Sequence, residues 1–369
     1  MKKILFLCTT SFQLMMAVSF RLLLFKDDEV DVIISDLING SEQLQRNVRC
    51  TGFFNKTYYL RNYKFDYKTS GKCESICKIL LRRKKVKSLI MPLDKYDSMF
   101  VSDSLPSINA IYEILYNRNK NMELFFYEEG PVSVLCDQGK HFNEKNKGTS
   151  KKWRIVSKLL GVKSVDGNYV AAYSSVAELM DKNYFEWRSI PIVKNEEIKH
   201  YIEILNKFWD YKGAGELSNK IVFLEESFFQ DNRGDKDIEI ITDIINHSFN
   251  RQVIVKLHPR TRVNRFSGMG ISTYTNFGVP WELIALNGDL ENAMLICVGS
   301  GAILYPKLYW GIDQKSIALV NCNEYRFDYL NNEYYDTFSK VCKEKNLAKL
   351  PSNKEEFFAF LEDFCNDTK

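Results

Sequence analysis

The sequence predicts an α/β protein of two halves, each built on a doubly wound parallel sheet. Its 369 residues exceed the size of one ordinary core. Short aliphatic runs bounded by turn residues alternate with segments of helical periodicity. The alternation lapses in the polar residues 137–175 and resumes after residues 190–217. We therefore expect a first domain over residues 1–200 and a second over residues 201–369.

The composition is that of a folded protein with no strong charge bias. Hydrophobic residues make up 45% of the chain and the net charge is only +4, which argues against a dedicated nucleic-acid binder. Basic runs over residues 82–87 and 145–158 could contact anionic lipid or an anionic substrate, although a solvated helix face is the ordinary explanation. No apolar run reaches the roughly 18 residues that a membrane span needs.

The nine cysteines predict reduced thiols in a cytoplasmic protein. They form no Cys-x-x-Cys pair, and their odd number fits no disulfide framework. Cys73 and Cys77 share one helical face without further ligands nearby, so we interpret them as packing residues.

In the first half, the opening apolar run is interpreted as a strand, a turn and a helix. Lys2 and Lys3 before it resemble a signal peptide, but polar residues from Thr9 to Gln13 interrupt the run. We expect strands at residues 4–8, 31–35, 58–60, 88–91 and 124–127, and helices at residues 12–24, 41–48, 73–83, 108–116 and 195–209.

The second half repeats the alternation. We expect strands at residues 221–224, 253–257, 294–298 and 316–320, and helices at residues 237–249, 281–286, 302–310, 338–345 and 354–367. The last of these helices could cross back to the first domain.

The stretch over residues 252–260, QVIVKLHPR, ends a strand in a basic cluster. Pro259 cannot donate to a ladder, so His258 stands at the carboxyl end of the strand, where open α/β sheets bind ligands. A capped strand end is the ordinary alternative. Together with Lys256 and Arg260, however, His258 suits a phosphate, because Arg engages two oxygens and His can donate a proton.

Three further motifs follow strands or open helices. Glu128-Glu129-Gly130 could supply a general base, since burial and a like charge raise the pKa of a carboxyl; two exposed acids in a turn are the alternative. Gly299-Ser300-Gly301 could bind an anion at a helix start, or Ser300 could be a plain N-cap. Pro280 and Glu282 mark another helix start, where the carboxylate could hold a ribose or merely favour the helix dipole.

The order of these motifs resembles that of the bacterial sialyltransferases of GT-B fold, and looks most like glycosyltransferase family 52. The resemblance rests on EEG (residues 128–130), on HP (residues 258–259), on the serine-bearing helix start at Ser300 and on the opening FLCTTSFQL. It implies two Rossmann-like domains facing a cleft, the first for the acceptor and the second for CMP-sialic acid.

The implied reaction transfers sialic acid with inversion from CMP-sialic acid to a galactose hydroxyl of a capsular polysaccharide or lipooligosaccharide, with an α2,3 linkage as the first expectation. No metal or other cofactor is expected. The resemblance assigns the phosphate to His258, Ser300, Gly299 and Gly301, and the ribose to Glu282. Glu129 is the favoured base, with Glu128, Glu226 and Asp231 as rivals, because the chain departs from the family pattern at residues 225–227.

Two other functions stay open from the sequence. A CDP-glycerol-type polyol-phosphate transferase would also use His-Pro, but it predicts an Asp-Tyr-Ser-Ser-like turn where this chain has Val298-Gly299-Ser300-Gly301. A non-catalytic scaffold of capsule assembly would neither bind nor consume a nucleotide. Attachment at the inner face of the cell membrane and a homodimer are also left open.

Overall fold

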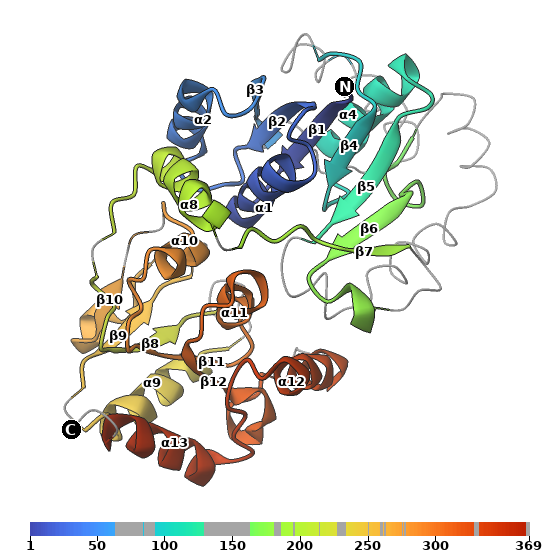
Figure 1. Cartoon of the computed structure of the whole chain (residues 1–369). Coiled ribbons are helices and arrows are strands. Elements are labelled where there is room, and N and C mark those ends of the chain that lie inside the picture. Colours follow the sequence, from blue (N-terminus) through green and yellow to red (C-terminus); the bar gives the residue numbers. More distant parts are fainter. Residues whose placement is uncertain are drawn as a thin grey trace. The chain divides into compact units, whose positions relative to one another are not determined.

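The computed structural model divides into two compact units, Met1–Asp210 and Tyr211–Lys369, each organised around its own parallel sheet (Figure 1). The structure describes residues 1–62, 84, 93–128, 163–180, 186–194, 196–213, 215–226, 234–249, 251–258, 261, 263–274, 276, 278–327 and 332–366. Several predictions lie outside these residues: the helix at 73–83 with Cys73 and Cys77, the strand at 88–91, the basic runs apart from Lys84, and Glu129, Asp231, Pro259 and Arg260.

The first unit holds a seven-stranded sheet in the order β3-β2-β1-β4-β5-β6-β7, with every pair of neighbours parallel. Its strands are β1 (Lys3–Cys8), β2 (Glu29–Ser35), β3 (Thr57–Leu60), β4 (Ser98–Val101), β5 (Glu123–Tyr127), β6 (Ala171–Ser174) and β7 (Trp187–Ser189). Its α-helices are α1 (Ser11–Leu23), α2 (Ser41–Thr51), α4 (Pro106–Arg118) and α8 (Glu196–Trp209). The strand order reverses between β1 and β4, which makes that point the topological switch of a doubly wound sheet.

The chain start confirms the expected strand, turn and helix. Residues 4–8 of β1 are buried, and Thr10 then caps α1 by accepting the amide of Gln13 at 3.2 Å. The Gln13 side chain accepts in return from the Thr10 amide, so the two residues form a reciprocal capping box.

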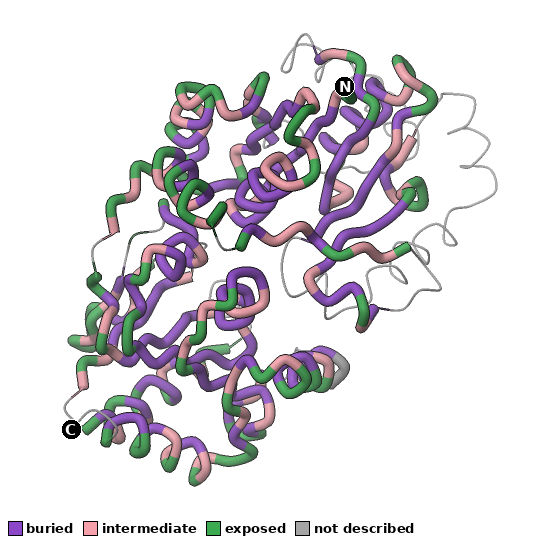
Figure 2. Tube along the Cα trace, viewed as in Figure 1, coloured by how far each residue is buried: buried purple, intermediate pink, exposed green. Residues whose placement is uncertain are grey.

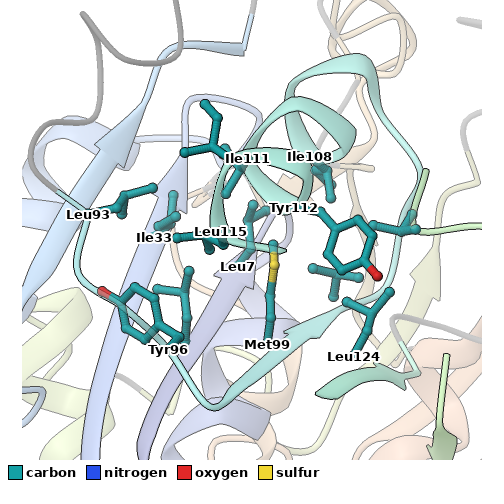
Figure 3. Packing of buried hydrophobic residues seen from close by; sticks show 14 of the residues in the cluster. Leu7, Ile33, Leu93, Tyr96, Met99, Ile108, Ile111, Tyr112, Leu115 and Leu124 are labelled. Atoms are coloured by element: carbon teal, nitrogen blue, oxygen red, sulfur yellow. The ribbon is translucent and has the colours of Figure 1, made fainter. Parts of the chain in front are cut away.

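Two helices of the first unit cover opposite faces of the sheet. Side chains alternate along a strand, so Phe6 and Leu7 point to different faces. Phe6 packs with Phe20 of α1 at a ring separation of 5.4 Å, whereas Leu7 belongs to the core under α4. Figure 3 shows that core, to which Leu7, Ile33, Met99 and Leu124 of four strands contribute with Ile108, Ile111 and Leu115 of α4. Each such side chain stabilises the unit by roughly 1.5–3 kcal/mol on burial.

The second unit holds a five-stranded parallel sheet in the order β10-β9-β8-β11-β12. Its strands are β8 (Ile221–Leu224), β9 (Val253–Lys256), β10 (Ser272–Tyr274), β11 (Met294–Cys297) and β12 (Lys315–Ala318). Its α-helices are α9 (Lys236–Asn246), α10 (Trp281–Leu286), α11 (Tyr305–Trp310), α12 (Asn332–Lys345) and α13 (Lys354–Asn366). The switch point here lies between β8 and β11. The central strands of both sheets are buried along most of their length, whereas the edge strands β3, β7 and β10 are only partly buried (Figure 2).

The last helix packs against its own unit. Lys354 at the start of α13 pairs with Glu239 at 2.8 Å and Asp243 at 2.9 Å, both on α9, and Cys365 contacts the Ser248 carbonyl at 3.3 Å. The idea that α13 also reaches the first domain stays a prediction. None of the described helices combines the length and the hydropathy of a membrane span.

Candidate functional site

In a parallel sheet every strand ends at the same edge, and ligands bind there near the switch point. In the second unit β8 lies between β9 and β11. The residues after these strands are Glu225 and Glu226, His258, and the Gly299-Ser300-Gly301 turn. The ends of β9 and β11 are two strand spacings apart, about 10 Å. The structure therefore brings His258 and the predicted GSG motif to one edge, with two carboxylates between them.

Glu225 fixes the loop that carries His258. Its buried carboxylate accepts the His258 amide at 2.8 Å and the Thr261 hydroxyl at 2.6 Å through one oxygen. The other oxygen pairs with Arg265 at 3.3 Å, and Arg265 also pairs with Asp235 and Asp237. A buried carboxylate needs such partners, because an unpaired charge away from water is costly.

His258 is half-buried and directly follows the buried Leu257. Its carbonyl accepts the Thr261 amide at 2.8 Å, which closes a turn just beyond the strand. Both backbone groups of His258 are therefore held, the amide by Glu225 and the carbonyl by Thr261. These two contacts restrict the backbone of His258, and therefore the position of its Cα at the sheet edge.

Glu226 reaches the opposite loop. One of its oxygens accepts the Gly299 amide at 2.6 Å, and burial raises the pKa of Glu226 to about 7 although this hydrogen bond lowers it. The Gly299 carbonyl accepts the Tyr334 hydroxyl at 2.6 Å. A Cβ on Gly299 would lie 3.2 Å from the Tyr334 ring and 3.3 Å from Val320, so close packing explains the glycine. The Gly299 amide is thus engaged by a carboxylate, and the expected phosphate contact through that amide is replaced here by Glu226.

The GSG turn does not open an α-helix, contrary to the expectation. Ser300 caps a single 3₁₀ turn (Gly301–Ile303) by accepting the Ala302 amide at 3.3 Å, and α11 begins only at Tyr305. Pro306 explains the break, because it has no amide for the Ala302 carbonyl four residues earlier. That carbonyl accepts the Trp281 indole at 3.1 Å instead, which joins α10 to the turn. Any anion binding here would come from the Ser300 hydroxyl and the Gly301 turn rather than from a long helix dipole.

Lys256 is buried and Glu282 is half-buried, and the two side chains interact electrostatically near the same edge. Burial lowers the pKa of Lys256 to about 8, against the effects of Glu282 and Glu225. Burial also raises the pKa of Glu282, against the effect of Lys256. The Lys256 ammonium lies 5.8 Å from the centre of the Trp281 ring. Pro280 is the N-cap of α10 and Glu282 lies in its first turn, as the sequence indicates.

The first unit ends its sheet in a carboxylate surrounded by neutral donors. Glu128 is fully buried and accepts the Ser174 hydroxyl at 2.6 Å, the Ser175 amide at 2.7 Å and the Ser175 hydroxyl at 2.8 Å. Burial raises its pKa to about 7, against the effect of the serine donors. The alternative of an exposed acid is therefore wrong for Glu128, and Glu129 lies outside the described residues.

Other hydroxyl and amide side chains surround this edge. Ser102 after β4 donates to the Tyr127 carbonyl, and Thr9 after β1 donates to Gln13 at 3.1 Å. Among the described residues, no three His, Cys, Asp or Glu side chains gather as metal ligands in either unit.

Sequence reasoning missed several of these residues. Ser174 ends β6 and Ser175 follows it, and this short strand lies in a stretch without clear periodicity. Tyr334 lies on α12 before the expected start of that helix. Glu225 stood out only as a departure from a family pattern. Its position could have been noticed because it comes directly after an aliphatic strand, which in the sheet lies next to the strand that precedes His258.

No protein-family model matches the sequence, and no curated protein matches it. Solved structures do match over nearly the whole chain. The glycosyltransferase of kitacinnamycin superposes with a TM-score of 0.52 at 7% identity, covering 99% of this chain and 91% of that one. An α/β-galactoside α2,3-sialyltransferase from Photobacterium phosphoreum superposes with a TM-score of 0.51 at 12% identity, covering 95% and 98%.

The UDP complex of LpCGTa superposes with a TM-score of 0.50 at 9% identity, covering 99% of this chain and 90% of that one. Identities this low show the fold alone. Two units, each with a parallel sheet of Rossmann-like strand order, agree with it. This chain is an α/β protein with the architecture of GT-B glycosyltransferase structures.

Proposed function

We propose that this chain is a glycosyltransferase that transfers sialic acid from CMP-sialic acid to a galactose hydroxyl of a bacterial surface glycan. The proposal is supported by the fold, by the match to a sialyltransferase structure, and by the residues at the carboxyl edge of the second sheet. In this proposal the donor binds at that edge and the first unit supplies the acceptor site.

The single observation that carries the proposal is that His258 and Ser300 follow the two strands on either side of β8, while Lys256 at the end of β9 interacts electrostatically with Glu282. A nucleoside monophosphate needs a cationic or proton-donating side chain at its phosphate and an acceptor at its ribose hydroxyls. In the proposed site His258 and Ser300 hydrogen-bond the phosphate, and Glu282 accepts from the ribose. Lys256 adds positive charge close to the ribose ligand.

Transfer breaks the bond between the anomeric carbon of sialic acid and a phosphate oxygen, and CMP leaves with two negative charges on its phosphate. His258 can donate a proton or a hydrogen bond to it, and Ser300 adds a second donor. Side chains aimed at the place where charge develops lower the barrier most. We therefore propose that transfer proceeds without a divalent metal; retention of full activity in EDTA would support this, and loss that Mg²⁺ restores would contradict it.

The base is proposed to come from the acidic motif of the first unit. Glu128 is enclosed by Ser174 and Ser175, which limits its contact with a substrate. We propose that Glu128 holds the end of β5 in place and that Glu129 accepts the proton of the acceptor hydroxyl. The neutral hydroxyl groups near Glu128 suit an uncharged sugar better than an anionic one.

Incubation of the chain with CMP-sialic acid and a panel of galactosides tests the proposal. The expected result is release of CMP with formation of a sialylated product, identified by its mass and linkage. Release of CMP without any product would indicate hydrolysis only. Transfer from CDP-glycerol, or no binding of either nucleotide, would favour the polyol-phosphate transferase or the non-catalytic scaffold instead.

A further inference from the structure

Glu225 and Glu226 lie at the end of β8, between the loop that carries His258 and the loop that carries Ser300. We infer that this pair positions the donor-binding loops, Glu225 setting the first and Glu226 setting the second. Neither carboxylate then takes part in proton transfer. The inference rests on the proposed function for its meaning in catalysis, but the loop contacts can be tested without it.

The place of β8 in the sheet makes such a pair possible. β8 is the first strand of the unit and has β9 on one side and β11 on the other. Two successive residues beyond its end can therefore reach the loops after both neighbours. Carboxylates are suited to this task, because each of their oxygens accepts more than one hydrogen bond and backbone amides are their natural donors.

Glu225 holds its loop at several points. It accepts from the backbone of His258 and from the side chain of Thr261, at 2.8 and 2.6 Å. Its second oxygen is paired with Arg265 at 3.3 Å, farther along the same loop. Arg265 also pairs with Asp235 and Asp237 at the start of α9. The loop is therefore joined both to the end of β8, through Glu225, and to the start of α9.

Glu226 and Tyr334 together hold the second loop at one residue, Gly299. Glu226 accepts the Gly299 amide at 2.6 Å while Tyr334 donates to the Gly299 carbonyl at 2.6 Å. Both the amide and the carbonyl of Gly299, the residue before Ser300, are therefore held by side chains. The oxygen that accepts the Gly299 amide is a poorer proton acceptor, which argues against Glu226 as the base. Burial raises the pKa of Glu226 to about 7 and argues the other way, so the glutamine variants below decide between the two roles.

Amide hydrogen exchange tests the contacts directly, with Glu225→Ala, Glu226→Ala and the matched control Glu362→Gln, an exposed glutamate on α13. Glu226→Ala is expected to speed exchange of the Gly299 amide by at least about tenfold and to leave the His258 amide unchanged. Glu225→Ala is expected to do the reverse. Equal changes at both amides, or none, would overturn the inference.

Glutamine variants separate positioning from proton transfer. Glu226→Gln keeps an oxygen for the Gly299 amide but cannot act as a base. Positioning predicts that Glu226→Ala weakens CMP binding and raises the donor KM about tenfold, and that Glu226→Gln restores both to within about threefold. If Glu226→Gln is as inactive in transfer as Glu226→Ala while its CMP affinity is normal, Glu226 is the base and the inference fails.

Loss of Glu225 leaves Arg265 partly unpaired and could unfold the unit. Thr261→Val therefore serves as the milder variant, since it removes one donor to Glu225 and keeps the charges. It should speed exchange at His258 severalfold without changing Gly299, and unchanged exchange at His258 would count against the inference. A wild-type chain that binds no CMP would contradict the proposed function, while the exchange results would still decide the role of the pair.

Discussion

The carboxyl edges of the two sheets use buried carboxylates in opposite ways. In the first unit Glu128 accepts hydrogen bonds from Ser174 and Ser175, which are neutral donors. In the second unit Glu225 is paired with Arg265, and Glu282 interacts electrostatically with Lys256. Among the described residues, the first edge therefore offers neutral donors to its carboxylate, and we call it the neutral edge; the second offers cations, and we call it the charged edge.

The difference in the partners of these carboxylates indicates which ligands each edge can bind. A neutral edge of hydroxyl groups suits uncharged sugar hydroxyls, whereas an edge with Lys256 and His258 suits a phosphate. The same fold element, a parallel strand end, thus carries two kinds of chemistry, and only the residues that follow the strand decide which. Fold similarity at 7–12% identity could not have revealed this, because it shows the arrangement of strands alone.

The largest expected effect is on the charged edge. His258→Ala should lower transfer by about 10²- to 10⁴-fold, since it removes the proposed phosphate donor. The His258 backbone contacts to Glu225 and Thr261 do not involve its side chain, so the fold should persist. Initial rates with CMP-sialic acid, together with the unfolding temperature, check both statements; full activity in a folded variant would end the assignment.

The matching change at the neutral edge should affect stability and its pH dependence. The pKa of Glu128 is raised to about 7 in the folded state, above its usual value near 4.5. The folded state therefore binds this proton more tightly, and the stabilisation present below about pH 4.5 is lost as pH rises through about 7. The loss amounts to about 3 kcal/mol.

Glu128→Gln should remove this dependence, because the amide stays neutral. The difference in unfolding free energy between the variant and the wild type should then grow by about 3 kcal/mol in favour of the variant between about pH 4 and pH 8. Denaturant unfolding across this range measures it. A constant difference would mean that Glu128 is not buried as an ionisable group.

Gly299→Ala sharpens the comparison from the packing side. Its Cβ would meet the Tyr334 ring at 3.2 Å and Val320 at 3.3 Å, so the second unit should lose about 1–3 kcal/mol. The backbone conformation of Gly299 does not itself require glycine. In a Tyr334→Leu background, Gly299→Ala should destabilise the protein less than it does in the wild type. An equal loss in both backgrounds would show that the Tyr334 ring is not the obstacle.

The smallest expected effect concerns Lys256. Its pKa is lowered to about 8 by burial, so the ammonium loses its proton as pH rises above about 8. The proposed site binds an anionic donor, and kcat/KM for that donor should therefore fall above about pH 8, up to roughly tenfold. Lys256→Met should show the lower value at every pH, and an unchanged profile in this variant would assign the titration to another group.

The sequence predicted the repeating architecture because aliphatic strands such as residues 221–224 are buried on both faces and carry a clear pattern. It missed β4, β6, β7 and β10, whose short segments owe their strand conformation to pairing with a neighbour. The site followed the same rule. His258 and Glu282 could be placed from strand and helix ends, but the Glu226 contact with Gly299 depends on which strands are neighbours in the sheet.

The helix at Ser300 shows a different limit. A glycine-serine-glycine turn before apolar residues favours a helix start, yet Pro306 and the Trp281 indole divide the segment. The proline is a local signal of this break, whereas the indole that satisfies the freed Ala302 carbonyl comes from another helix, which local periodicity cannot report.

A donor site at the charged edge is tested by calorimetric titration of CMP into the wild type, His258→Ala and Glu128→Gln. We expect that CMP binds the wild type more tightly than UDP or GDP, that His258→Ala weakens this binding at least tenfold, and that Glu128→Gln leaves it unchanged. Equal affinity for the three nucleotides, or weakening by Glu128→Gln but not by His258→Ala, would contradict a donor site at the charged edge of the second sheet.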